Sequence, residues 1–271
     1  MKKLFALLLA LAMSLSLVAC GGNDAPVDDD AAEDTAAEET TVVYAVEAGS
    51  AGEAAALENG FEINSVDTQA KALMEVQAGT SGAAIIDSLM AGAMVGEGTS
   101  YPDLKVTDQK LTEELYGVSC RKGSNLAAYI NGVFAEAYAA GTMQEIATTY
   151  GVQEALVEQT ADIIDIPTDG DVADIVASGK LIVGITDFAP MDYKDDNGEW
   201  IGFDADMAKI VADKLGVEIE FIEIDWDSKI MELDSGNIDV VWNGMTLTDA
   251  VMEAMECSTA YCNNAQVVVT K

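Results

Sequence analysis

The sequence has no histidine, and its 13 basic residues face 48 acidic ones, a formal net charge of −35. Such an excess of negative charge argues against nucleic acid and against an anionic membrane surface as partners, since both repel it. Without histidine or a CxxC pair a zinc site is improbable, so we expect neither a metal nor a cofactor. No nucleophile elbow is present either, and we predict that the protein is not an enzyme.

Cysteine is also scarce, with four residues in the whole chain. Cys120, Cys257 and Cys262 lie in the part expected to fold, and the short spacing between the last two allows a small disulfide loop in an exported protein. Unpaired, partly buried thiols are the alternative, and the sequence does not decide between them.

The first 19 residues have the features of a signal peptide. A basic start precedes an apolar run over residues 4–17 that is too short to span a membrane, and small residues come before Cys20. The letters "LVAC" resemble a bacterial lipobox, which implies cleavage before Cys20 and lipid on its thiol; a signal cleaved elsewhere is the alternative. Residues 20–40 carry many acids and no base, and we expect a disordered tether. These features predict an extracytoplasmic protein, either lipid-anchored to the outer face of the cell membrane or periplasmic.

Beyond the tether, short apolar runs alternate with helical patterns, which indicates an α/β fold. Strands are predicted at "TVVYAVEA", "AAII", "LYGVSC", "KLIVGIT", "VEIEFIEI" and "IDVVW", with capped helices between several of them. The segments "KALMEVQAGTSGAAIID" (residues 71–87) and "KIMELDSGNIDVVW" (residues 229–242) share one pattern of helix, glycine stop and buried strand. We interpret the two as matching parts of two similar lobes, coincidence between two α/β segments being the alternative.

Four stretches together resemble the extracytoplasmic amino-acid-binding proteins of ABC importers. They are "GKLIVGITDFAPMDYKDDNGEWIGFDADMAKIVADKLG" (residues 179–216), "SGNIDVVWNGMTLT" (residues 235–248), "AVEAGSAGE" (residues 45–53) and "AAIIDSLMA" (residues 83–91). The resemblance implies a two-lobed fold of the periplasmic-binding-protein type II kind, each lobe a central sheet flanked by helices, with a hinge between them. It also implies that an amino acid is captured between the lobes and delivered to a membrane permease.

The order of these segments differs from the family, in which the "GKLIVGITD" segment opens the mature protein. The chain therefore resembles a circular permutation, tolerated where chain ends lie close together. We expect a smaller lobe at residues 41–105, a hinge crossing at 106–114 and a larger lobe at 115–271, with an acidic join at 151–179. In this arrangement "AQVVVTK" at the C-terminus pairs with "LYGVSC". We expect a monomer; a product of fused or truncated genes that swaps lobes between chains is the alternative.

The resemblance also implies which residues contact the ligand. Phe188 and Trp226 would form an apolar wall, and Asp87 would pair with the ligand's ammonium group. The remaining expected contacts are Asp187, Asn243, Gly244, Met245, Thr246, Ser50 and Ala51. Each has a plainer interpretation, since Phe188 and Trp226 suit a core, and Ser50 and Asp87 suit helix caps.

One element of the family site is missing. Val251 stands where the family usually has an arginine that holds the ligand carboxylate with two hydrogen bonds. Each such charge-assisted bond contributes about 1.5–3 kcal/mol, so its loss weakens binding by about a hundredfold or more. Arg121 is the obvious substitute cation, although we expect it at the exterior of the hinge. A sensing or degenerate binding module of the same fold is therefore the alternative function.

Overall fold

The computed structural model describes residues 41–271, and its elements form two mixed sheets with helices packed against them. The predicted signal peptide, Cys20 and the acidic tether lie outside the described residues. None of the helices found between residues 41 and 271 combines the length and the apolar character needed to cross a membrane.

The first sheet has the strand order β2-β1-β3-β13-β4. Its strands are β1 (Val43–Glu47), β2 (Glu62–Val66), β3 (Ala83–Asp87), β4 (Lys105–Lys110) and β13 (Gln266–Thr270). Three helices accompany it: α1 (Ala51–Glu58), α2 (Gln69–Ala78) and α3 (Ser88–Met94). We call this group of elements the smaller lobe.

Alternation along β3 explains how both faces of the first sheet are covered. Ile85 packs in one cluster with Ala56 of α1, whereas Ile86 packs in another with Leu73 of α2. Successive side chains of a strand point to opposite faces, so α1 and α2 lie on opposite sides of the sheet. The strand is buried throughout, as a continuous apolar run predicts.

The second sheet has the order β11-β5-β10-β6-β9, and β12 also pairs with β5. Its strands are β5 (Glu114–Cys120), β6 (Lys180–Ile185), β9 (Glu218–Glu223), β10 (Val240–Thr246), β11 (Glu256–Cys257) and β12 (Cys262–Asn264). The associated helices are α4 (Leu126–Ala140), α5 (Thr142–Tyr150), η1 (Gln153–Ala155), α6 (Gly170–Ser178), α7 (Phe203–Leu215), η2 (Trp226–Ser228), α8 (Lys229–Ser235) and α9 (Asp249–Ala254). We call this group the larger lobe.

Its apolar residues again divide between the two faces. Val241 packs with Leu233 of α8, whereas the neighbouring Trp242 packs edge-to-face on Phe134 of α4, with ring centroids 5.5 Å apart. A separate hairpin pairs β7 (Tyr193–Lys194) with β8 (Trp200–Ile201). The strands predicted in both lobes are confirmed.

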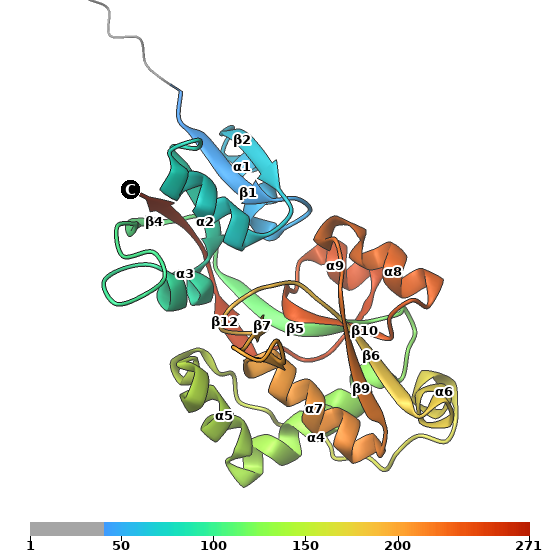
Figure 1. The fold of residues 1–271 in the computed structure, drawn as a ribbon. Helices are drawn as coiled ribbons and strands as arrows, with labels where there is room; N and C mark the ends of the chain where they lie inside the picture. Colours follow the sequence, from blue (N-terminus) through green and yellow to red (C-terminus); the bar gives the residue numbers. More distant parts are fainter. Residues whose placement is uncertain (1–40) are drawn as a thin grey trace, which may run out of the picture. The chain divides into compact units, whose positions relative to one another are not determined.

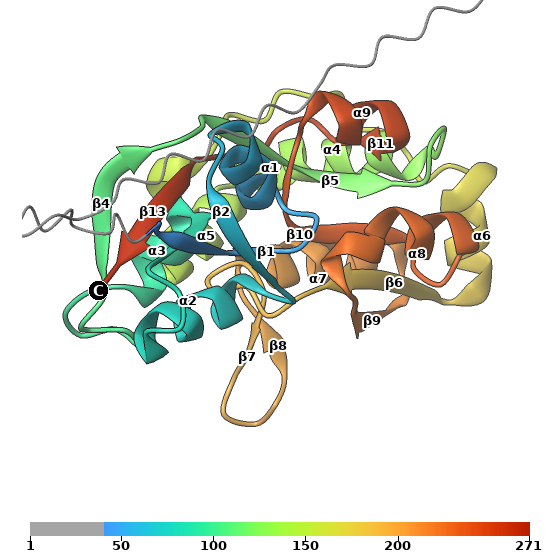
Figure 2. The same ribbon diagram turned by 90° about the horizontal axis from the view of Figure 1, so that it is seen from above.

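The C-terminal strand corrects the predicted lobe boundaries. Residues 266–270 pair with β3 and β4 of the first sheet, so the expectation that they pair with β5 is wrong; it is Cys262–Asn264 that pairs there. In Figures 1 and 2 this dark red strand lies among the blue and teal elements of the smaller lobe. The hydrophobic alternation of "AQVVVTK" suits either sheet, which is why the sequence could not decide.

The predicted hinge changes for the same reason. Lys105–Lys110, expected within a single crossing, is strand β4 of the first sheet. The chain crosses between the sheets twice, at residues 111–113 and at Ala265, which stands between β12 and β13. Two crossings of the chain constrain the relative motion of the lobes more than the single crossing that we predicted would.

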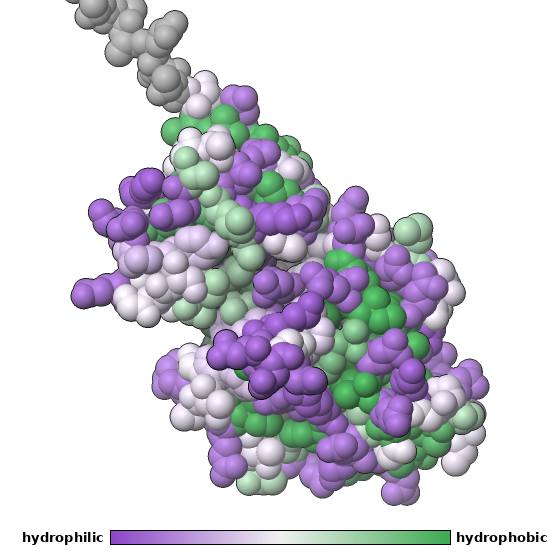
Figure 3. All heavy atoms as spheres, in the orientation of Figure 1, coloured by the Kyte–Doolittle hydropathy of each residue, from purple (hydrophilic) through white to green (hydrophobic). Residues whose placement is uncertain are grey.

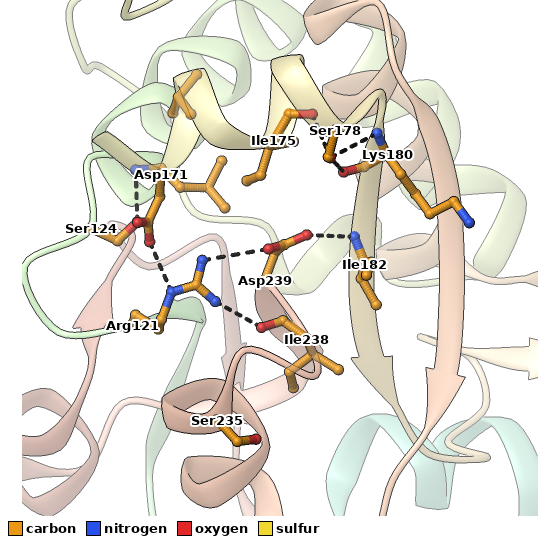
Figure 4. A network of polar contacts seen from close by, with 12 residues as sticks. Arg121, Ser124, Asp171, Ile175, Ser178, Lys180, Ile182, Ser235, Ile238 and Asp239 are labelled. Carbon is orange, nitrogen blue, oxygen red and sulfur yellow. Dashed lines mark hydrogen bonds and ion pairs between the residues drawn. The ribbon is translucent and has the colours of Figure 1, made fainter. Parts of the chain in front are cut away.

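Arg121 ties the acidic join to the larger lobe. Its guanidinium pairs with Asp171 of α6 at 3.1 Å and with Asp239 at 3.4 Å, and donates to the carbonyl of Ile238 at 2.9 Å (Figure 4). Asp239 in turn accepts the main-chain N–H of Ile182 in β6. These partners occupy Arg121 in a structural network, so it is not the cation that replaces the expected arginine.

The surface reflects the acidic composition. On the face drawn in Figure 3, hydrophilic residues cover most of both lobes, with hydrophobic patches between them. Cys120, Cys257 and Cys262 are all free thiols, which agrees with the second of the two alternatives left open by the sequence.

Candidate functional site

A cavity of about 250 Å³ is lined by residues of both lobes. Nine of the ten predicted contact residues line it: Ser50, Ala51, Asp87, Phe188, Trp226, Asn243, Gly244, Met245 and Thr246. They come from five separate segments of the chain, and the fold brings them together at the ends of β1, β3, β6, β9 and β10. The carboxyl ends of strands in α/β sheets are where such sites usually form.

Asp187 is the exception, because it lines a different hollow with Tyr150 and Lys194. After β6 ends, Phe188 and Asp192 exchange main-chain hydrogen bonds of 2.6 and 2.9 Å, which closes a narrow loop. Asp187 lies in the bend between β6 and this loop, and it faces the second hollow rather than the cavity.

The turn at the end of β10 is fixed by a buried carboxyl. The N–H of Gly244 donates to Asp204 Oδ2 at 2.7 Å, and the hydroxyl of Tyr261 donates to the same oxygen at 2.7 Å. Gly244 has a φ of +57°, and a Cβ there would lie 2.4 Å from Cε1 of Phe188. Glycine is therefore required both by the backbone conformation and by the close approach of the aromatic ring.

Polar groups of this turn are paired within the protein. The N–H of Gly244 donates to Asp204. The hydroxyl of Thr246 donates to Glu114 at 3.0 Å, and both amide atoms of Asn243 bond to Thr186. The side chains of this turn thus hold its shape, and what the turn presents to the cavity is mainly apolar surface and main chain.

Asp204 belongs to a pair of acids in the core of the larger lobe. Burial raises the pKa of Asp204 to about 7, although hydrogen bonds from Tyr261 and Gly244 act to lower it. Burial and the neighbouring Asp204 raise the pKa of Asp192 well above its usual range. We infer that this pair carries less than its full charge near neutral pH.

The N-terminus of α1 faces the cavity from the smaller lobe. Ser50 caps the helix by accepting the N–H of Glu53 at 3.1 Å, and Glu53 accepts the N–H of Gly49 at 2.8 Å. The cap leaves Ala51 at the first turn against the cavity. Unpaired N–H groups and the helix dipole make this end favourable for a carboxylate.

A cation lines the cavity, although the sequence analysis did not select it. Lys229 is 8% exposed, and its Nζ donates to the carbonyls of Gly49 at 2.9 Å and Trp226 at 3.0 Å. The Nζ also lies 4.8 Å from the centroid of the Trp226 ring. Burial lowers the pKa of Lys229, whereas Glu47 and Asp227 oppose that shift. Since an ammonium has three N–H donors, one is left for a ligand.

The bond from Lys229 to Gly49 joins the two lobes. Gly49 has a φ of +69°, and a Cβ there would lie 2.9 Å from Cα of Asp227. The lobes therefore touch at this point through backbone, next to the cavity. Trp226 and Lys229 are three residues apart across the start of α8, and residues at this spacing share one face. This spacing is the signal in the sequence that could have identified Lys229 as a lining residue.

Glu47 and Gln69 are among the further lining residues that we did not predict. Gln69 bonds to Asp87 twice, accepting its main-chain N–H at 2.8 Å and donating to its carboxylate. Glu47 is 4% exposed; burial and the nearby Asp87 raise its pKa to about 8. A glutamate that ends a predicted strand gives no sign in the sequence that it is buried.

Asp87 is held by side chains of both lobes. Besides Gln69, it accepts hydrogen bonds from Tyr116 at 2.7 Å, from Gln266 at 2.9 Å and from Asn264. Burial and the charge of Glu114 raise the pKa of Asp87 to about 7, while these donors lower it.

The site lacks the arginine that the family usually has. Val251 lines the cavity, so the position of the missing arginine is at the site and carries no charge there. Within residues 41–271 no group of three or more His, Cys, Asp or Glu side chains is placed to hold a metal ion.

Comparison with known proteins places one part of this chain in a family. Residues 181–271 match the model of bacterial extracellular solute-binding proteins, family 3. The matched segment supplies Phe188, Trp226 and the turn of β10 to the cavity. Together with the two mixed sheets, the match confirms the predicted type II-like fold.

Relatives of this family 3 segment are binding proteins. A probable amino-acid ABC transporter-binding protein of Haemophilus influenzae is 34% identical over 104 residues, which are 38% of this chain and 40% of that protein. The arginine-binding extracellular protein ArtP of Bacillus subtilis is 37% identical over 93 residues, or 34% and 36% of the two chains. The chain thus spans about two fifths of the length of the curated relatives it matches.

Among solved structures, the arginine-bound form of truncated ArgBP from T. maritima is 39% identical to this chain. The match covers 30% of this chain and 39% of that one, with a TM-score of 0.29.

The buried carboxyl of Glu47 makes the stability of the empty protein depend on pH. Its folded pKa of about 8 lies above the ordinary 4.5, so between these values the folded state binds more protons than the unfolded state. The free energy of unfolding therefore falls as pH rises through this window, by at most about 1.4 kcal/mol per pH unit for one group. We expect Glu47→Gln to remove this contribution and to raise stability at pH 8, measured by urea denaturation at several pH values.

Glu58→Gln is the matched control, because it removes an exposed carboxyl from the same lobe. If Glu47→Gln and Glu58→Gln change the pH profile equally, the buried carboxyl does not have the effect that we assign to it.

Proposed function

We propose that the chain captures a free amino acid in the cavity between its lobes and delivers it to the permease of an ABC importer. The observation that carries the proposal is that charged groups of both signs line one cavity between the lobes. Lys229 and the N-terminus of α1 line it together with the carboxyls of Glu47 and Asp87. A zwitterion presents the opposite charges on one small molecule.

In this proposal each end of the ligand has a partner. The α-carboxylate takes the free N–H of Lys229 and the amides near Ala51, and the α-ammonium pairs with Asp87. Phe188 and Trp226 contact the ligand side chain. When the lobes close on the ligand and exclude water, each of these charged hydrogen bonds is stronger than it would be at the surface.

Export and anchoring belong to the same proposal. Residues 1–19 act as a signal peptide, Cys20 carries lipid, and residues 20–40 tether the binding part to the outer face of the membrane. Support comes from the lipobox-like sequence and from relatives described as extracellular or as ABC transporter-binding proteins. Ligand stabilises the closed arrangement of the lobes by its differential affinity for it, and the permease recognises that arrangement.

We also propose that the chain is a circularly permuted, monomeric member of the fold. The family 3 segment lies at residues 181–271, behind the segments of the smaller lobe, and β13 pairs with β3 and β4 of the same chain. We expect light scattering to give the molar mass of one chain. A stable mass of two chains would favour exchange of lobes between copies and contradict the proposal.

A ligand screen tests the function directly. We expect one or a few amino acids from a panel that includes L-arginine to raise the melting temperature of a soluble form that begins after the tether. A ligand at about a hundred times its Kd stabilises by about 2.7 kcal/mol, a shift of roughly 5–10 °C for a domain of this size. Absence of any shift at millimolar concentration would contradict amino-acid capture.

A pair of variants tests which cation meets the carboxylate. Lys229→Gln removes the charge while keeping hydrogen-bonding capacity, and we expect Kd for the ligand found in the screen to rise about tenfold or more. Adding Val251→Arg to that variant restores affinity, because it returns a cation to the lining of the same cavity. Isothermal titration calorimetry measures both.

Lys214→Gln is the control, since Lys214 pairs with Glu136 on the exposed surface of the larger lobe.

A degenerate or sensing module is the second candidate function, favoured by Val251 in the place of the family's arginine. In that case no amino acid binds, and Val251→Arg changes nothing.

A further inference from the structure

Two buried carboxyls line the cavity at the ends of neighbouring strands. Glu47 is the last residue of β1 and Asp87 the last of β3, and these strands pair in parallel. Both side chains line the cavity, and they are 4% and 5% exposed. Parallel strands bring their carboxyl ends to one edge of the sheet, so the two groups share one wall.

The two carboxyls differ in how far their hydrogen-bonding capacity is used. Asp87 accepts from four side chains, those of Gln69, Tyr116, Asn264 and Gln266. Glu47 Oε1 is buried without any partner. A buried carboxylate oxygen that lacks a donor is costly and rare in folded proteins. In the wall of a cavity, it indicates a donor supplied by a ligand.

The charges around Glu47 and Asp87 favour a cationic ligand group. Glu114 on β5 faces Asp87, whereas Glu53 on α1 and Asp227 on η2 face Lys229, which itself lies near Glu47. Lys229 on α8 is the cation of the cavity lining, and the phenol of Tyr116 donates to Asp87. With one cation among several acids, a second positive charge between the two carboxyls lowers their repulsion.

We propose that the ammonium group of the ligand is received between Glu47 and Asp87, so that both carboxyls are ligand contacts. The assignment rests on the proposed function for the class of ligand, because an amino acid supplies the ammonium group. It goes beyond the assignment of Asp87 alone by adding Glu47, whose unpaired oxygen is the free acceptor.

Proton release accompanies binding in this arrangement. Burial raises the pKa of Glu47 to about 8 and that of Asp87 to about 7, so near neutral pH the empty pair retains part of its protons. An ammonium between the two groups favours their charged forms. The complex then holds fewer protons than the free protein, and affinity rises with pH, at most about tenfold per pH unit for each proton released.

A small cation tests this pair without relying on amino-acid binding. The full chain in detergent solution is melted with about 100 mM methylammonium chloride or with tetramethylammonium chloride, which has no N–H donor. The expected affinity for a cation of two heavy atoms is roughly millimolar at best. We expect methylammonium alone to raise the melting temperature, by roughly 2 °C, and by more at pH 8 than at pH 6.

Two variants complete the experiment. Glu58→Gln keeps the methylammonium effect, whereas Glu47→Gln abolishes it. Equal effects of the two salts on the unmodified protein, or an unchanged methylammonium effect in Glu47→Gln, would overturn the proposal.

An amino acid that binds in the screen gives a second readout. Calorimetry in buffers of different ionisation enthalpy counts the protons released, and we expect fewer for Glu47→Gln, together with an affinity at pH 8 about tenfold weaker. Equal affinity and equal proton release in the variant would refute the role of Glu47. A screen without any binder, combined with the methylammonium result, would refute amino-acid capture and leave the cation pair in place.

Discussion

The cavity depends on the burial of charged groups of both signs between two sheets. Removing a carboxylate or an ammonium from water is costly unless hydrogen bonds or an opposite charge compensate. Asp87 has four side-chain donors, and Lys229 has two carbonyls and an aromatic face. Burial and the charge of Asp87 raise the pKa of Glu47, whose Oε1 has no hydrogen-bond partner. A zwitterion is the kind of molecule that completes such a set of charges.

The shape of the site depends in turn on a carboxyl that does not line it. Asp204, in the first turn of α7, accepts the N–H of Gly244 and the hydroxyl of Tyr261. The first bond holds the end of β10 in the left-handed conformation that glycine alone adopts readily. Phe188 then fits against Gly244 with no room for a Cβ between them. The apolar wall of the cavity is thus set from within the core of the larger lobe.

Local patterns in the sequence predicted much of the fold and little of the electrostatics. Apolar runs located the strands, and nine predicted contacts line one cavity because short motifs determine local turns and caps. The partner of the C-terminal strand was wrong, since alternation along "AQVVVTK" fits either sheet and pairing is a long-range property. Glu47 and Lys229 were missed because burial of a charged side chain depends on elements distant in sequence, such as the approach of Gly49 to Asp227.

The second crossing has a consequence for how the lobes can move. Asn264 ends β12 in one sheet and Gln266 begins β13 in the other, and both amides donate to Asp87 and to Glu114. A change in the angle between the sheets therefore alters the solvation of Asp87 at the same moment. The backbone at this crossing and the carboxyl of Asp87 are thus coupled directly, without any intermediate residue.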